Sequence, residues 1–244
     1  MTSASEIPPS PARRRKSTDS DRSPFAVAWY RVVQQAVLQA QLVAGGIRAT
    51  GRDDFPKSGG VLLISNHLSY YDVFVLGLLL PRMLNYVARS TLFVPVLAPL
   101  IRSVGGFPIQ REGMGASGLK ETLKRLRGGS IVTFFPEGTR SPDGSLQPLK
   151  PGIATLASRA RVPIVAAGIA GTFESWPRHR LLPRGHAVRL HFGKPIQPEV
   201  IAELDDSQLL ARLDSELKSS VAIARDALAR DQGRLAPLPS NTAT

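Results

Sequence analysis

His67 and Asp72 have the residue types and the spacing of a paired acid–base site. A neutral imidazole takes up a proton near neutral pH, and a carboxylate bound to its other ring nitrogen fixes the tautomer. The two residues stand five positions apart, which is about 140° around a continuous helix and puts them on opposite faces of a strand. The chain must therefore turn between them if the pair is to meet.

The flanking residues predict where that turn lies. Residues 61–64 form an apolar run typical of a buried strand, and Val73–Leu80 is an apolar segment long enough to open a helix. We therefore expect the pair at a strand-to-helix junction, a kind of position that commonly carries function. A second motif, Phe135-Pro136-Glu137-Gly138-Thr139-Arg140, follows an apolar run in the same way.

The composition limits the class of protein. With 244 residues and 43% hydrophobic content, the chain can bury one substantial core, and no break in composition divides it. It contains no cysteine, which excludes disulfides, thiol nucleophiles and thiolate metal sites. The formal charge of +12 indicates an anionic partner: nucleic acid, an anionic lipid surface or a phosphorylated substrate.

No apolar run reaches the roughly 18 to 20 residues that span a bilayer. The longest candidate, Phe25–Ala44, is interrupted by an arginine and several glutamines. Its apolar residues recur at intervals of three and four: Phe25, Trp29, Val32, Val33, Ala36, Val37, Ala40 and Val43. This spacing predicts an amphipathic helix, and it fits a helix at a membrane interface as well as a helix packed on the core.

Four blocks of the sequence resemble, in order, the motifs of the glycerolipid acyltransferases, in particular the bacterial 1-acylglycerol-3-phosphate acyltransferase family. Residues 66–72 resemble the H-x4-D motif of that family, and residues 105–111 resemble its second block. Residues 135–141, with Lys150 and Gly152 downstream, are similar to the third block, and residues 162–165 to the fourth. A lone histidine and aspartate at this spacing is weak support, whereas four blocks in order are strong support.

The resemblance implies that His67 and Asp72 are the catalytic residues. His67 would take the proton of an acceptor hydroxyl as that hydroxyl attacks a thioester carbonyl, and Asp72 would orient the imidazole. The sequence contains no G-x-S-x-G motif, which agrees with direct transfer and no acyl-enzyme. The alternative is a buried structural histidine beside a helix-capping aspartate.

The resemblance also implies a set of substrate-binding residues: Arg111, Glu137, Gly138, Thr139, Arg140 and Lys150. Arginine suits bidentate binding of a phosphate and lysine adds a point charge, although solvated surface charge is the alternative for all three cations. Glu137 is expected to accept a hydrogen bond from a glycerol hydroxyl or to pair with an arginine. Gly138 is expected to let the backbone approach closely.

The remaining histidines do not have the spacing of metal ligands, so we predict no metal site. These residues are His179, His186 and His191.

The predicted fold class is α/β, with a single domain in which helices flank a mixed central sheet, preceded by an N-terminal amphipathic, membrane-interfacial helix. The expected segments are a disordered basic tail (1–23), the amphipathic helix (24–46), the acyltransferase domain (47–230) and a disordered tail (231–244). Further strands are expected near 84–88, 104–109, 131–135, 163–169 and 187–192, and helices over 119–126, 153–160 and 210–228. Residues 91–101 are expected to form an apolar wall or a hairpin.

By resemblance, the protein is expected to transfer a fatty acyl group from acyl-CoA or acyl carrier protein to 1-acylglycerol-3-phosphate (lysophosphatidic acid), forming phosphatidic acid without a cofactor. We expect it to bind anionic membrane lipids at the cytoplasmic face of the cell membrane, with no spanning helix, and not to bind nucleic acid. Another lyso acceptor, such as a lyso-ornithine lipid or other lysophospholipid, is an alternative. A non-catalytic module that binds anionic membranes or nucleic acid is another, but it leaves the four blocks unexplained.

Overall fold

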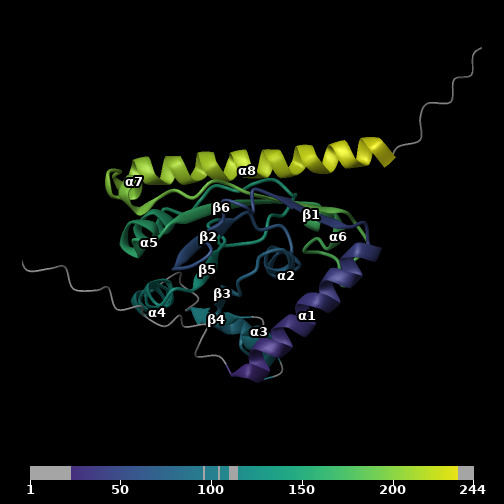
Figure 1. Cartoon of the computed structure of the whole chain (residues 1–244), viewed down its shortest axis with the longest axis horizontal. Coiled ribbons are helices and arrows are strands. Elements are labelled where there is room, and N and C mark those ends of the chain that lie inside the picture. The colour runs from purple at the N-terminus through teal and green to yellow at the C-terminus, as the bar shows by residue number, and fades with distance from the viewer. Residues whose placement is uncertain (1–22, 96, 104, 110–114, 236–244) are drawn as a thin grey trace, which may run out of the picture.

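A seven-stranded mixed sheet with helices on both faces organises the protein, which confirms the predicted fold class (Figure 1). The structure is a computed structural model that describes residues 23–235 except 96, 104 and 110–114. The strands are β1 (Ile47–Thr50), β2 (Val61–Ser65), β3 (Leu84–Arg89), β4 (Gly106–Ile109), β5 (Ile131–Phe134), β6 (Ile164–Ala170) and β7 (Val188–Phe192).

The strand order is β1-β7-β6-β2-β5-β3-β4. Strands β2 to β6 all run parallel to one another, whereas β7 is antiparallel to β6 and parallel to β1. Strands β2 and β6 are buried at every position, as parallel strands covered on both faces are expected to be. The carboxyl ends of β2, β5 and β6, which are neighbours, therefore meet at one edge of the sheet.

The helices are α1 (Pro24–Val43), α2 (Asp72–Leu78), α3 (Leu97–Ser103), α4 (Ala116–Arg127), α5 (Gly152–Ala160), α6 (Thr172–Ser175), α7 (Pro198–Ala202) and α8 (Asp206–Leu235). Helices α4, α5, α7 and α8 close a hydrophobic core on one face of the sheet, and α2 closes a second core on the other. The long helix α8 crosses that first face, on the side of the sheet away from α1 (Figure 1). It packs so closely on β6 that a side chain at Gly168 would strike the carbonyl of Ser220.

Two segments differ from the sequence prediction. The described part of residues 91–101 does not form a hairpin, one of the two predicted alternatives, because a 3₁₀ turn (Ser90–Leu92) and helix α3 occupy most of it. Helix α8 continues to Leu235, into the tail that was expected to begin at residue 231. Its last turns have a specific partner, since Asp231 forms ion pairs with Arg48 on β1 and Arg189 on β7.

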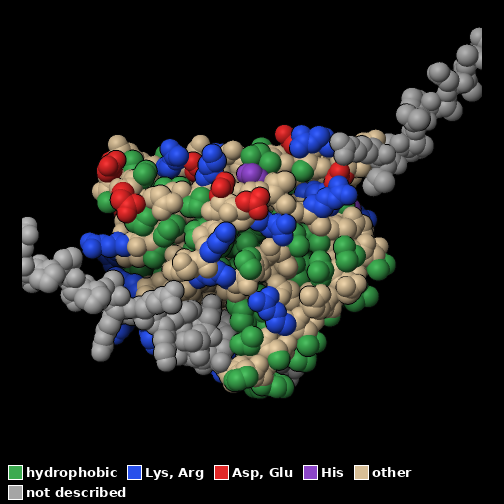
Figure 2. Space-filling view, in the orientation of Figure 1, with side chains coloured by type: hydrophobic (Ala, Val, Ile, Leu, Met, Phe, Trp, Pro, Cys, Tyr) green, Lys and Arg blue, Asp and Glu red, His purple; other side chains and the backbone are tan. Residues whose placement is uncertain are grey.

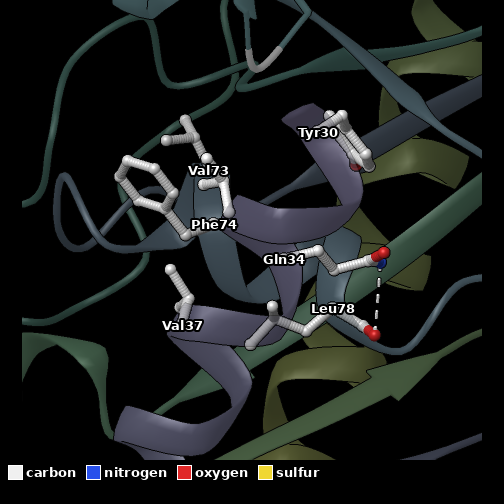
Figure 3. Close-up of a pocket in the computed structure, with 7 residues that line it drawn as sticks. Tyr30, Gln34, Val37, Val73, Phe74 and Leu78 are labelled. Atoms are coloured by element: carbon white, nitrogen blue, oxygen red, sulfur yellow. Dashed lines mark hydrogen bonds between the residues drawn. The ribbon is translucent and has the colours of Figure 1, made fainter. Parts of the chain in front are cut away.

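Helix α1 packs against α2 through a face that contains glutamines. Gln34 Nε2 donates to the carbonyl of Gly77 at 2.5 Å, and Gln41 Nε2 donates to the carbonyl of His186 at 2.8 Å. Figure 3 shows Gln34 reaching Leu78 and the shallow apolar crevice between the two helices, to which Val37 and Phe74 contribute. The helix is therefore fixed to the domain by buried polar contacts.

The opposite face of α1 carries most of the apolar stripe seen in the sequence. Phe25 is 78% exposed and Val43 is 91% exposed, and Trp29, Val32, Ala36 and Ala40 are exposed between them. Within the described part of the chain, no helix is both long enough and apolar enough to cross a membrane. Helix α1 thus buries Gln34 and Gln41 together with Tyr30, and leaves much of its apolar stripe exposed.

Candidate active site

The turn between β2 and α2 brings the His67 imidazole and the Asp72 carboxylate into contact. Nδ1 of His67 lies 2.8 Å from Oδ2 of Asp72. Strand β2 ends at Ser65 and helix α2 begins at Asp72, so the pair spans the strand-to-helix junction that the flanking residues predict. The non-helical residues between them fold the aspartate back toward the histidine.

Asp72 is completely buried and accepts hydrogen bonds from four donors. Oδ2 accepts from the backbone N–H of Leu68 at 2.7 Å and of Ser69 at 2.8 Å, in addition to the imidazole. Oδ1 accepts from the hydroxyl of Thr172 at 2.6 Å. The carboxylate is therefore held in one orientation from both of its oxygens.

The contact with Asp72 sets the tautomer of His67. Because the carboxylate accepts, the neutral imidazole carries its proton on Nδ1 and leaves Nε2 as the basic nitrogen. The ring stacks on Phe135 with centroids 4.0 Å apart, and its side chain is 18% exposed. The imidazole is thus held in place from two sides while part of it remains open to a substrate.

Glu137, which follows β5, binds the backbone of the same turn. Its Oε1 accepts from the N–H of His67 at 2.6 Å, and its Oε2 accepts from the N–H of Gln147 at 2.8 Å. Burial raises the pKa of Glu137 from its ordinary value of 4.5 to about 7, against the lowering effect of the two N–H donors. Backbone amides therefore bind both oxygens of Glu137 and fix this carboxyl group to the turn that carries His67.

The other predicted substrate-binding residues beyond β5 lie beside this turn. Gly138 has a φ of +70°, and a Cβ atom there would lie 2.7 Å from Cε of Lys150, so the lysine stem passes directly over the glycine. Thr139 and Lys150 are exposed. The next residues are tied back to the histidine, because the N–H of Ser141 donates to the carbonyl of His67 at 2.7 Å.

Arg140 stacks on an aromatic side chain from within the histidine–aspartate segment. Its guanidinium carbon lies 3.5 Å from the ring centroid of Tyr70, whose ring in turn meets that of Trp176 edge to face at 6.1 Å. Partial burial lowers the pKa of Arg140 from its ordinary value. Arg111 lies outside the described residues, so the structure places three of the four positions that could contribute charge here: Glu137, Arg140 and Lys150.

Thr172 and Asn66 support the site in ways that the sequence analysis missed. Thr172 opens α6 just after β6 and binds the second oxygen of Asp72. Asn66 binds both the N–H and the carbonyl of Ile169, at 2.8 and 3.0 Å, which fixes the end of β2 to β6. A sequence signal for Thr172 exists: it is the first hydroxyl after a predicted strand, and parallel strands end at a common edge.

Over the part of the chain that the structure describes, no group of three or more histidine, aspartate or glutamate side chains is arranged to hold a metal ion. The two buried carboxyl groups of the site instead bind the imidazole, a hydroxyl and backbone N–H groups. What the arrangement offers chemically is an oriented imidazole, a buried carboxylate behind it and cations beside it.

This site and this fold define a class of protein. The sequence model of the acyltransferase family matches residues 46–170, about half of the chain, and that range includes His67, Asp72 and Glu137. The chain belongs to the acyltransferase family.

Individual relatives within the family are similar in sequence. The chain is 28% identical to a 1-acyl-sn-glycerol-3-phosphate acyltransferase of Bacillus subtilis over 79% of this chain and 94% of that protein. It is 34% identical to the chloroplastic 1-acyl-sn-glycerol-3-phosphate acyltransferase BAT2 of Brassica napus over 60% of this chain and 44% of that protein. The chain thus spans nearly all of the bacterial relative and less than half of the plant one.

A solved structure shows the same fold. The crystal structure of the 1-acyl-sn-glycerophosphate (LPA) acyltransferase PlsC from Thermotoga maritima superimposes with a TM-score of 0.71, at 21% identity, over 86% of this chain and 83% of that one. The predicted resemblance to glycerolipid acyltransferases is therefore confirmed at the level of family and fold.

Proposed function

We propose that this acyltransferase transfers a fatty acyl group from acyl-CoA or acyl carrier protein to the free hydroxyl of 1-acylglycerol-3-phosphate, giving phosphatidic acid. The names of its relatives support the acceptor. The single observation that carries the mechanism is the 2.8 Å contact between Nδ1 of His67 and the buried carboxylate of Asp72. That contact leaves Nε2 as a base aimed away from the aspartate.

The reaction follows from those two side chains. Nε2 of His67 takes the proton of the acceptor hydroxyl as its oxygen attacks the thioester carbonyl and forms the new C–O bond. Asp72 stabilises the imidazolium that results. When the tetrahedral intermediate collapses, the C–S bond breaks and the thiolate takes the proton from His67. No acyl-enzyme and no cofactor are required.

We assign the acceptor phosphate to the cations beside the turn. Arg140 is held over Tyr70, which leaves its guanidinium edge for a phosphate oxygen, and the exposed Lys150 lies across Gly138. Arg111 is proposed to contribute a third charge. Thr139, exposed between Gly138 and Arg140, is proposed to donate its hydroxyl to the same acceptor.

The apolar parts of both substrates need an apolar surface next to His67. Val73 and Phe74 directly follow Asp72 and line the crevice between α1 and α2 (Figure 3). We propose that this crevice marks the side from which acyl chains approach, since apolar walls with a few polar groups are usual for such sites.

We further propose that the protein lies on the cytoplasmic face of the cell membrane through the outward face of α1. Figure 2 shows apolar side chains along the edge of the molecule where α1 runs in Figure 1. A helix with aromatic and branched residues on one face binds at a bilayer interface, and the net charge of +12 favours anionic lipids over neutral ones. This charge is proposed to serve lipid and donor binding rather than nucleic acid.

The test is an acylation assay with labelled acyl-CoA or acyl carrier protein and a panel of lyso acceptors that begins with lysophosphatidic acid. His67→Ala is expected to lower kcat about 10²- to 10⁴-fold, which is the range for loss of a general base. His191→Ala, on β7, is the matched control and should retain activity. If the wild type acylates only another lysolipid, that lysolipid replaces lysophosphatidic acid as the assigned acceptor. If no acceptor is acylated with either donor, the proposal is contradicted.

A further inference from the structure

The loop between α6 and β7 exposes two consecutive leucines. Leu181 is 92% exposed and Leu182 is 76% exposed. Isolated apolar residues are common on protein surfaces, but two adjacent leucines at a loop tip put a compact apolar group into water. Such a tip has a stabilising environment only when something apolar covers it.

The structure holds this tip in place. The N–H of Arg184 donates to the carbonyl of Ser175 at 2.9 Å, and the hydroxyl of Ser175 donates to the carbonyl of Arg184 at 2.8 Å. The indole N–H of Trp176 donates to the carbonyl of Arg180 at 3.0 Å. These bonds close the base of the loop, so the two leucines are presented by a closed loop rather than by a loose strand.

The charge of the loop is of one sign. Between Trp176 and Ala187 the sequence contains Arg178, Arg180 and Arg184 and no acidic residue. Arg178 and Arg184 are exposed. An apolar tip flanked by arginines matches the interface of an anionic bilayer, where leucines enter the acyl region and guanidinium groups bind phosphates.

The loop adjoins the end of α1. Gly185 lies against Ala44, because a Cβ atom on the glycine would be 3.1 Å from the alanine carbonyl oxygen. Gln41 binds the carbonyl of His186 from the same turn of the helix. The base of the loop that carries the two leucines therefore adjoins the end of the helix whose exposed apolar residues reach Val43.

The base of the loop also touches the active-site turn. The hydroxyl of Ser69 donates to the carbonyl of Trp176 at 2.6 Å, and the rings of Tyr70 and Trp176 meet edge to face. Both Ser69 and Tyr70 stand between His67 and Asp72 in the chain. Whatever the tip binds is thus connected, through one loop, to the segment that holds the catalytic pair.

We propose that the tip Leu181–Leu182 inserts into an anionic phospholipid bilayer as a second lipid contact, with Arg178 and Arg184 on the lipid phosphates. This inference rests on the proposed function, because it concerns the surface from which that enzyme takes a lipid acceptor. Two contacts, α1 and the loop, fix the orientation of the molecule on the bilayer.

The experiment measures binding of the full chain to sedimented vesicles of phosphatidylcholine with and without phosphatidylglycerol. The double variant Leu181→Ser/Leu182→Ser is expected to bind anionic vesicles about tenfold more weakly than the wild type, since each buried leucine contributes substantially to partitioning. The matched control is Val200→Ser/Ile223→Ser, which removes two exposed apolar residues from α7 and α8 and should bind like the wild type. Arg178→Gln should reduce the preference for anionic over neutral vesicles.

A second measurement locates the tip directly. Leu182→Trp is expected to show blue-shifted emission on binding vesicles and quenching by brominated lipid, beyond the signal of the wild type. Equal vesicle binding by the double leucine variant and the wild type would overturn the proposal. So would normal vesicle binding together with weakened binding of acyl carrier protein, which would assign the tip to a protein partner.

Failure of the loop to bind lipid can be distinguished from failure of the proposed acyl transfer. In detergent micelles that deliver lysophosphatidic acid, the double leucine variant should keep wild-type kcat, whereas on vesicles its rate should fall with its binding. His67→Ala should show the opposite pattern, with normal vesicle binding and lost activity. Absence of acylation in the wild type would refute the function while leaving the vesicle result interpretable.

Discussion

Asp72 and Glu137 are two buried carboxylates beside one histidine, and they hold different parts of it. Asp72, at the start of α2, binds the imidazole and receives three further donors. Glu137, after β5, binds the backbone N–H of His67 and that of Gln147 and, among the residues that the structure describes, no side chain. The comparison teaches that burial alone does not say what an acid does, because the donors around it decide whether it orients a reactive group or fixes the chain.

The sharpest way to break this comparison is Asp72→Asn. An asparagine that places its oxygen at the Oδ2 position still accepts from the two amides, and its amide group faces the hydroxyl of Thr172 as a donor. The fold should therefore survive, while the charge that stabilises the imidazolium is lost. We expect kcat to fall about 10²- to 10⁴-fold with little change in Tm.

Steady-state kinetics and thermal unfolding of the same preparation measure both quantities. Asp226→Asn removes an exposed carboxylate from α8 and is the matched control, which should leave kcat unchanged. A variant at Asp72 that unfolds at a much lower temperature but turns over normally would make Asp72 a structural residue and would remove the contrast with Glu137.

The corresponding change at the other carboxylate, Glu137→Gln, should act chiefly on stability. Both oxygens of Glu137 accept from backbone N–H groups, so the amide nitrogen of glutamine must face a donor at one of the two positions. An unpaired buried amide costs about 1 to 3 kcal/mol, and we expect that loss in the free energy of unfolding by urea.

The difference in stability between wild type and Glu137→Gln should also depend on pH. Since the pKa of Glu137 in the folded protein is raised from 4.5 to about 7, the folded state binds more protons than the unfolded state across that range. The free energy of unfolding of the wild type therefore declines as pH rises through this window. The difference in free energy of unfolding between the wild type and Glu137→Gln should then become smaller from pH 5 to pH 7.5. A gap that widens with pH would contradict the assigned direction of the pKa shift.

The smallest expected effect is at Thr172, whose hydroxyl donates to Oδ1 of Asp72, the oxygen that does not contact His67. Thr172→Val removes one hydrogen bond of about 1 kcal/mol to the carboxylate, and we expect kcat to fall roughly 2- to 10-fold with KM nearly unchanged. Thr172→Ser keeps the hydroxyl and should restore most of the rate. A rise in KM with kcat unchanged would instead assign Thr172 to substrate binding and not to positioning of Asp72.

Much of the fold was predictable because its elements have strong local patterns. The continuous apolar runs of β2, β5 and β6 indicate buried parallel strands, and glycines at 128 and 129 end α4. Strand β1 was not predicted, because its four residues, Ile47–Thr50, alternate too briefly to stand out. Helices α6 and α7, with four and five residues, are likewise too short for a helical period to appear.

The site was predictable where it lies within one stretch of chain and not where it spans distant ones. His67 and Asp72 are five positions apart, so their spacing alone demands a turn. The partners of Asp72 and Asn66 come from Thr172 and Ile169, which are more than a hundred positions further along, and no local pattern joins them. The glutamine face of α1 was also missed, because the helical pattern drew attention to the apolar side, which fits a membrane interface as well as the core, and not to the polar residues that hold the helix to the domain.

The edge strand β1 has a consequence for how the chain is made. Within the described sheet its neighbour is β7, and Arg48 on it pairs with Asp231 near the end of α8. A ribosome delivers β1 early, yet the strand has nothing to pair with until Phe192 has emerged, and its ion pair waits for Asp231. The sheet is therefore completed only after β7 has been made, and the apolar face of α1, which is made before it, is in water from the start unless a bilayer receives it.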